Sequence, residues 1–277
     1  RPSYRKWAYG ALVSNIGTWM QRTAQDWLVL TQLTDHSASA VGIVLALQFG
    51  PQLLLLPFTG SAADHFDRRK LLIATQSLMG LLALGLGVLT VVGAVELWQV
   101  YLFAFGLGCV AAFDAPARQT FVSDLVSDED LPNAVALNST SFNAARMIGP
   151  ALAGLLIGWV GTGGMFLLNA ASYLAVLVSL TRLQAGEMQP RERSAQSKRG
   201  LLEGFGYIWE RPQLKVVLAM LFLIGTFSLN FPIFLSTMSA SEFGLGARDF
   251  GLLTSGMAIG SVTGTLWAAS RCSHSVR

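Results

Sequence analysis

The segment LLIATQSLMGLLALGLGVLTVVG, residues 71–93, carries no charged side chain over its whole length. The hydrocarbon core of a bilayer is about 30 Å thick, and a helix needs roughly 20 apolar residues to cross it. Backbone polar groups in that core find no water, so a spanning segment satisfies them by forming a helix. The sequence therefore predicts a membrane-spanning helix at this position.

Seven further segments of similar character lie on either side of it. The chain is 52% hydrophobic and 13% charged, whereas a soluble domain has about a quarter charged residues. The composition and the long apolar runs together predict an all-α membrane protein. We expect its spans at residues 7–30, 39–62, 71–93, 97–115, 139–160, 164–183, 214–235 and 250–269.

Lys and Arg residues are concentrated in alternate connections between these segments, and such residues mark the cytoplasmic side of a membrane protein. If the N-terminus is cytoplasmic, the outer connections hold only Arg248. The inner connections then hold Arg1, Arg5, Lys6, Arg68, Arg69, Lys70, Arg118, Arg182, Arg191, Arg193, Lys198, Arg199, Arg211, Lys215, Arg271 and Arg277. This distribution predicts a multi-pass protein of the bacterial inner membrane with a cytoplasmic N-terminus. It also argues against a nucleic-acid partner, although the pI is about 9.1.

The spans fall into two groups separated by a long polar connection. We expect residues 1–183 to form a six-helix half and residues 184–213 a cytoplasmic loop that ends in an amphipathic helix. Residues 214–277 then supply two helices of a second half. Transporters built from repeated halves have this organisation, so we expect the second half to be incomplete.

The first span holds Gln21, Arg22, Gln25 and Asp26 close together in its second half. Charges at membrane depth are costly and usually face an internal cavity. Arg22 and Asp26 are four residues apart, so they share a helix face and can pair. We expect all four to line a cavity, with Asp26 and Arg22 as candidates for proton coupling. The alternative is a static Arg22–Asp26 pair near the outer interface.

The fifth span contributes Asn143 and Arg146, which are three residues apart on one face. Arg146 suits a carboxylate or catecholate of a substrate, or alternatively a salt bridge near the cytoplasmic boundary. Further along, Pro150 removes a backbone donor and can kink the helix. Gly149 and Gly154 allow another helix to approach closely.

The connection after the second span reads Gly60-Ser-Ala-Ala-Asp64-His65-Phe-Asp67-Arg68-Arg69-Lys70. Judged from its residue types alone, this segment is equally consistent with an ordinary basic cytoplasmic loop and with a functional one. Its pattern of Gly60, Asp64, Arg68 and Arg69 resembles the loop signature of the major facilitator superfamily. His65 and Asp67 depart from the usual Arg and Gly of that signature.

Two further stretches, residues 113–121 and 133–154, resemble the enterobactin-exporter-type branch of bacterial efflux proteins. The resemblance implies a helical bundle of twelve spans, of which the last four would be absent here. It implies a conformational latch made by Gly60, Asp64, Arg68, Arg69 and Asp114. It also implies an antiporter-like motif at Gly149, Pro150 and Gly154, where Ala145 and Ala153 replace glycines of the family.

These observations predict a secondary active transporter that exports siderophore- or drug-like molecules across the inner membrane by alternating access, coupled to protons. Its partners would be a small-molecule substrate, protons and the lipid bilayer. The sequence lacks zincin, nucleophile-elbow and Walker motifs, so we expect no enzyme activity and no cofactor or metal. The alternative is an inactive transporter fragment or a membrane scaffold.

Overall fold

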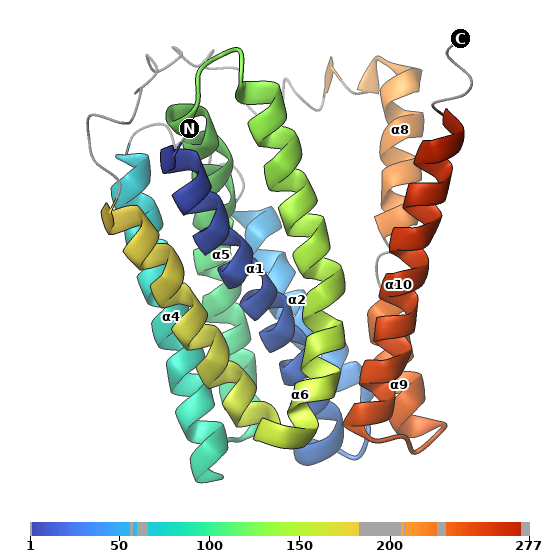
Figure 1. Ribbon diagram of the computed structural model, residues 1–277. Coiled ribbons are helices and arrows are strands. Elements are labelled where there is room, and N and C mark those ends of the chain that lie inside the picture. The colour runs from blue at the N-terminus through green and yellow to red at the C-terminus, as the bar shows by residue number, and fades with distance from the viewer. Residues whose placement is uncertain are drawn as a thin grey trace.

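A computed structural model describes residues 2–55, 58–59, 66–182, 206–207, 209–225 and 231–272. These residues form helices and short connections, as expected for an all-α membrane protein. The helices are α1 (Pro2–Leu28), α2 (Ala38–Leu54), α4 (Arg68–Val92), α5 (Leu97–Leu125), α6 (Leu131–Arg182), α8 (Pro212–Leu223), α9 (Phe231–Ser241) and α10 (Ala247–Cys272), and a π-helical turn, η1 (Val29–Leu33), extends α1 (Figure 1).

The 52-residue α6 is two helices joined at Gly161. Gly161 has φ 69° and ψ 173°, a conformation that glycine adopts readily and that side chains disfavour. Figure 1 shows the chain reversing direction at this end of α6. The two limbs correspond to the predicted spans 139–160 and 164–183.

Three of the described helices, α4, α5 and α6, are long and apolar enough to cross a membrane. The α2 helix is apolar but ends after 17 residues, and α8 is shorter still. The predicted span 214–235 covers α8 and the start of α9, and residues 226–230 between them lie outside the described part. The predicted amphipathic helix also falls mainly outside it, because residues 183–205 and 208 are not described.

Capping groups fix the connections of the α4–α5 pair. The Asp67 side chain accepts a hydrogen bond from the Lys70 backbone N–H at 3.0 Å and so begins α4. Gly93, with φ 75°, ends α4 in the left-handed conformation. Glu96 and Gln99 form a capping box at the start of α5. The two helices therefore meet through a short, well-defined turn.

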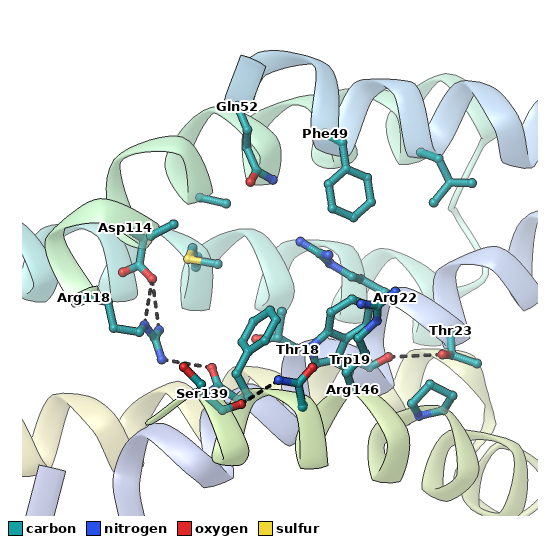
Figure 2. A pocket seen from close by; sticks show the side chains of 18 of the residues that line it. Thr18, Trp19, Arg22, Thr23, Phe49, Gln52, Asp114, Arg118, Ser139 and Arg146 are labelled. Carbon is teal, nitrogen blue, oxygen red and sulfur yellow. Dashed lines mark hydrogen bonds and ion pairs between the residues drawn. The ribbon is translucent and has the colours of Figure 1, made fainter. Parts of the chain in front are cut away.

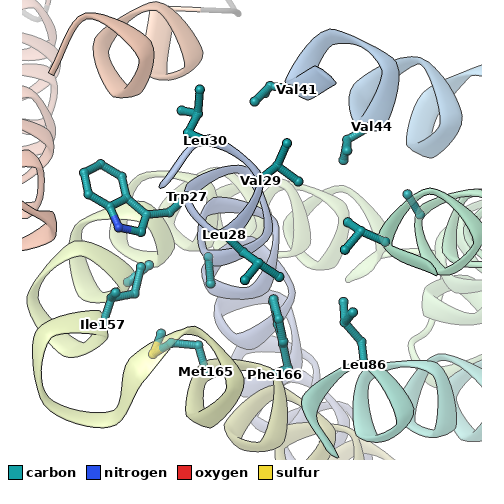
Figure 3. Close-up of a cluster of buried hydrophobic side chains, with 14 of the residues drawn as sticks. Trp27, Leu28, Val29, Leu30, Val41, Val44, Leu86, Ile157, Met165 and Phe166 are labelled. Carbon is teal, nitrogen blue, oxygen red and sulfur yellow. The ribbon is translucent and has the colours of Figure 1, made fainter. Parts of the chain in front are cut away.

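The α1 helix packs along both limbs of α6 and lies inside the bundle. Near its end, Trp27 and Leu28 are buried with Met165 and Phe166 of the second limb (Figure 3). Near its start, Trp7 packs against Phe121 of α5, with ring centroids 6.2 Å apart. The start of α1 and the end of α10 lie at the same end of the molecule (Figure 1).

Gly149 brings α6 into backbone contact with α1. A Cβ atom at this position would lie 2.5 Å from the Trp19 Cβ and 3.1 Å from the Met20 backbone nitrogen. Neither atom is the end of a flexible side chain, so the helices would have to separate. The expected function of Gly149 in close packing is therefore visible in the structure.

We predict that Gly149→Val destabilises the fold by about 2 kcal/mol, because added side-chain volume in a packed contact typically costs that much. Gly158→Val is the matched control on the same limb, since a Cβ there would meet nothing within 4 Å. Thermal unfolding in detergent should show a lower midpoint for the first variant than for the second. Equal midpoints would contradict the packing argument.

Candidate transport cavity

A cavity of about 630 Å³ lies among α1, α2, α5 and the first limb of α6 (Figure 2). It combines charged and amide side chains with aromatic and aliphatic ones. The lining residues are Asn15, Thr18, Trp19, Arg22, Thr23, Asp26, Leu45, Phe49, Gln52, Met79, Ala111, Asp114, Ala115, Arg118, Gln119, Asn138, Ser139, Phe142, Asn143, Arg146, Pro150 and Gly225. A volume in the range of small-molecule sites, with polar groups set in an apolar wall, suits an organic ligand.

Arg22 and Asp26 both line this cavity, but no salt bridge joins them in the described structure. The Arg22 guanidinium instead lies over the rings of Trp19 and Phe49, with its Cζ atom 4.9 and 4.6 Å from their centroids. The alternative of a static Arg22–Asp26 salt bridge is therefore wrong, because aromatic rings hold the guanidinium. Asp26 Oδ1 and Arg22 Nε are buried and have no hydrogen-bond partner among the described residues.

Gln21 and Gln25 are buried between helices and do not line the cavity. Gln21 accepts a hydrogen bond from Asn169 Nδ2 at 2.6 Å. Gln25 accepts one from Gln48 Nε2 at 3.3 Å and donates to the Val100 carbonyl at 3.5 Å. The prediction that these two line a cavity is corrected, because each lies about 100° around the helix from the following Arg22 or Asp26.

Asn143 and Arg146 lie on the cavity wall contributed by α6. The Arg146 Cζ atom is 5.5 Å from the Trp19 ring centroid, so two guanidiniums lie over one indole (Figure 2). Asn143 donates to the Ser139 carbonyl within its own helix at 2.9 Å. Trp19 also meets Phe142 edge to face at 5.9 Å.

A charged network that the sequence analysis missed occupies the α5 wall. The guanidinium of Arg118 donates to Asp114 Oδ2 from Nη2 at 3.0 Å and from Nε at 3.2 Å. Asp114 Oδ1 accepts further hydrogen bonds from Thr75 Oγ1 and Gln76 Nε2, both at 2.7 Å. Arg118 Nη1 also reaches Asn15 Oδ1 at 3.0 Å. The network therefore links α1, α4 and α5.

The predicted span ended at Ala115, which placed Asp114 at a helix end and Arg118 in a loop. The structure continues α5 to Leu125. The four-residue spacing of Asp114 and Arg118 was the available signal, because it is the spacing of a helical ion pair.

The basic residues after Asp67 make different contacts from those expected of them. Arg68 forms a salt bridge with Asp124 at 2.6 Å, and Asp124 lies at the end of the extended α5. Arg69 donates to the carbonyls of Leu180 and Thr181 at 2.9 and 3.1 Å. The structure thus ties α4 to α5 and α6 at this end. It does not bring Arg68 and Arg69 together with Asp114, whose partner is Arg118.

Two other members of the expected latch, Gly60 and Asp64, lie outside the described residues. The latch as a functional unit stays a prediction. In the antiporter-like motif, Gly149 contacts α1, Pro150 lines the cavity and Gly154 contacts α10. A Cβ on Gly251 would lie 2.5 Å from the Gly154 carbonyl carbon.

The helices α9 and α10 contact the earlier helices α1 and α6 mainly at the end of the molecule away from the start of α1 (Figure 1). The rings of Trp27 and Phe250 stack with centroids 5.5 Å apart at an interplanar angle of 19°. Gly251, which follows Phe250 on α10, contacts the backbone of Gly154 on α6. These contacts join α10 to α1 and α6 beyond the cavity.

An apolar helical bundle around a charged cavity is the architecture of a multi-pass membrane protein, in which charged side chains face the interior. Residues 3–273 match a family described as "transmembrane secretion effector". The chain therefore belongs to this family, which is part of the major facilitator superfamily.

Individual relatives agree with this assignment. The staphyloferrin A transporter of Staphylococcus aureus is 28% identical over 254 residues, which are 91% of this chain and 63% of that protein. The enterobactin exporter EntS of Escherichia coli O1:K1 is 27% identical, over 90% of this chain and 59% of the exporter. The chain thus spans less than two thirds of these relatives.

A solved structure shares the fold. It is a bacterial homolog of the human lysosomal transporter Spinster, in an inward-facing and unoccupied conformation. The TM-score is 0.62 and the sequence identity 16%, over 98% of this chain and 63% of that one.

Proposed function

We propose that this chain is a secondary active transporter that exports small organic molecules across the bacterial inner membrane in exchange for protons. The observation that carries the proposal is the cavity of about 630 Å³, lined by charged side chains inside an apolar bundle. Charges at this depth are retained where they serve a substrate or ion pathway. The names of the two relatives support a siderophore-like cargo.

Asp26 is the proposed proton-coupling residue. Its side chain lines the cavity, it is 8% exposed, and its Oδ1 atom accepts no hydrogen bond from the part of the chain that the structure describes. A carboxylate without a fixed donor is free to exchange a proton, whereas Asp114 is committed to Arg118, Thr75 and Gln76. The N-terminus would lie in the cytoplasm.

Alternating access would use contacts at both ends of the bundle. The Arg68–Asp124 salt bridge holds one end of α4 against α5. At the other end of the bundle, the Trp27–Phe250 stack joins α1 to α10. Paired, partly buried charges bias a two-state equilibrium when the pairing exists in only one state.

A transport assay tests the proposal. The purified chain is reconstituted in vesicles, a pH gradient is imposed, and the movement of a radiolabelled citrate- or catechol-type siderophore is measured. Gradient-dependent movement above empty vesicles is the expected result. Its absence would contradict transport by this chain and favour the alternative, a membrane scaffold without transport activity.

We predict that Arg68→Ala shifts the conformational equilibrium more than it changes substrate binding. The salt bridge to Asp124 lies at the helix ends, and neither residue lines the cavity. Spin labels on α4 and α10 should report a changed distance distribution, while the Kd of a bound siderophore changes less than about twofold. An unchanged distance distribution together with weakened siderophore binding would show that Arg68 does not act as part of a conformational latch.

A further inference from the structure

We propose that an interfacial cluster of Tyr207, Trp209, Arg211 and Lys215 binds the headgroup of an anionic phospholipid. The four residues lie at the start of α8. This helix begins at the end of the molecule where α1 also begins (Figure 1). The inference goes beyond the proposed function and does not depend on it, because it concerns the lipid around the bundle rather than a transported molecule.

Two cation–aromatic pairs organise the interfacial cluster. The Arg211 Cζ atom lies 4.3 Å from the centroid of the Tyr207 ring, and the Lys215 Nζ atom lies 5.4 Å from that of the Trp209 ring. The Lys215 backbone N–H donates to the Arg211 carbonyl at 3.3 Å, so both cations belong to one helical turn. A ring that stacks on the face of a guanidinium leaves its N–H edge for phosphate oxygens.

The electrostatics at the start of α8 favour an anion. Both salt bridges found within the described part of the chain join other side chains, so no carboxylate there neutralises Arg211 or Lys215. Residues 206–207 and 209–225 contain these two cations and one carboxylate, that of the exposed Glu210. Among the described residues no side chain caps this end of α8, and the positive end of a helix dipole attracts anions.

Exposed apolar surface beside the cations assigns this anion to a lipid. Trp209 is 77% exposed and Tyr207 is 52% exposed, and both residue types concentrate where a membrane meets water. The apolar α8 buries none of its residues in the described structure, and Val216, Val217 and Leu218 are all exposed. A soluble anion would leave this surface uncovered, whereas the acyl chains of a phospholipid would cover it while the headgroup contacts the cations.

The expected preference for an anionic lipid is modest and measurable. One Lys or Arg near an anionic membrane surface raises affinity about fivefold. Two cations opposed by Glu210 should therefore give about a fivefold preference for phosphatidylglycerol over zwitterionic phosphatidylcholine.

The test uses the purified full chain in phosphatidylcholine nanodiscs that contain a trace of photoactivatable lipid, with the reactive group near the headgroup. Mass spectrometry after digestion with pepsin measures labelling of the peptide that contains Arg211 and Lys215. Photoactivatable phosphatidylglycerol should label this peptide about fivefold more than photoactivatable phosphatidylcholine does. Soluble glycerol phosphate, which carries the anionic group without acyl chains, should not compete.

Charge variants assign the preference to the named side chains. Arg211→Gln and Lys215→Gln should each lower phosphatidylglycerol labelling about fivefold, to the level of phosphatidylcholine. Glu210→Gln should raise it about fivefold, a gain that loss of folded protein cannot produce. Arg5→Gln is the matched control, because it removes an exposed cation from the start of α1 at the same end of the molecule (Figure 1). Labelling in this control should stay at the wild-type level.

Three results would overturn the site. The first is equal labelling of this peptide by the two lipids in the wild-type chain. The second is unchanged phosphatidylglycerol labelling in the three charge variants at wild-type elution and helicity. The third is competition by glycerol phosphate as strong as that by phosphatidylglycerol, which would assign the cluster to a soluble anion instead of a lipid.

Discussion

Asp26→Asn should reduce pH-gradient-driven flux to the level of empty vesicles when the membrane potential is held at zero. The Asp26 carboxyl lies on the cavity wall without a hydrogen-bond donor on Oδ1, and Asn cannot take up or release a proton. A potential-driven component should survive. A membrane potential acts on each moving charge with about 2.3 kcal/mol per 100 mV, and an anion leaving a negative interior gains this energy without proton exchange.

The measurement uses vesicles in which valinomycin and equal potassium concentrations clamp the potential, followed by the same vesicles with a potassium gradient and no pH gradient. Gln25→Glu is not a suitable control because Gln25 is buried in a hydrogen-bonded contact. Asp35→Asn, which lies in the turn after η1, is suitable because it changes an exposed carboxylate outside the cavity. Full pH-driven flux in Asp26→Asn would remove this residue from coupling.

The sequence predicted the apolar part of the fold well because the limits of a span are marked by charge. The segment 71–93 matches α4, Arg68–Val92, to within three residues, since Arg68, Arg69 and Lys70 stop the apolar run. The turn at Gly161 could be predicted equally well from the sequence, because a glycine separates two apolar runs there.

The site was harder to predict because its partners come from distant segments. Arg22 and Asp26 have the spacing of an ion pair, yet Phe49 of α2 and Trp19 hold the guanidinium instead. Helical spacing shows which residues share a face and gives no information about aromatic rings on a neighbouring helix. For the same reason the sequence placed Gln21 and Gln25 in the cavity, although Asn169 and Gln48 bind them between helices.

The extension of α5 illustrates the same limit. Asp114, Pro116 and Arg118 together looked like the end of a span, since isolated charges and proline are disfavoured in a lipid-facing helix. Thr75, Gln76 and Asn15 satisfy these charges from two other helices. These contacts offset the free-energy cost of burying the two charges, and they exist only in the folded bundle.

Those contacts make Arg118→Met the substitution with the largest expected effect on stability. It removes the guanidinium that donates two hydrogen bonds to Asp114 Oδ2, and Asp114 is only 5% exposed. Breaking a buried pair by deleting one partner typically costs 3–5 kcal/mol, because the other charge is left uncompensated. We expect a loss of about 3 kcal/mol, since Thr75 and Gln76 still donate to Asp114 Oδ1.

The double variant Arg118→Met with Asp114→Asn separates this charge effect from lost packing. Asn keeps the acceptor for Thr75 and Gln76 and removes the buried charge, so most of the lost stability should return. Unfolding in detergent by increasing SDS measures both variants, with Arg5→Met as the surface control. If the double variant is no more stable than Arg118→Met alone, Arg118 stabilises the bundle through its side-chain volume and its bond to Asn15 rather than through its charge. Recovery would instead show that Arg118 stabilises the bundle mainly by neutralising the buried charge of Asp114.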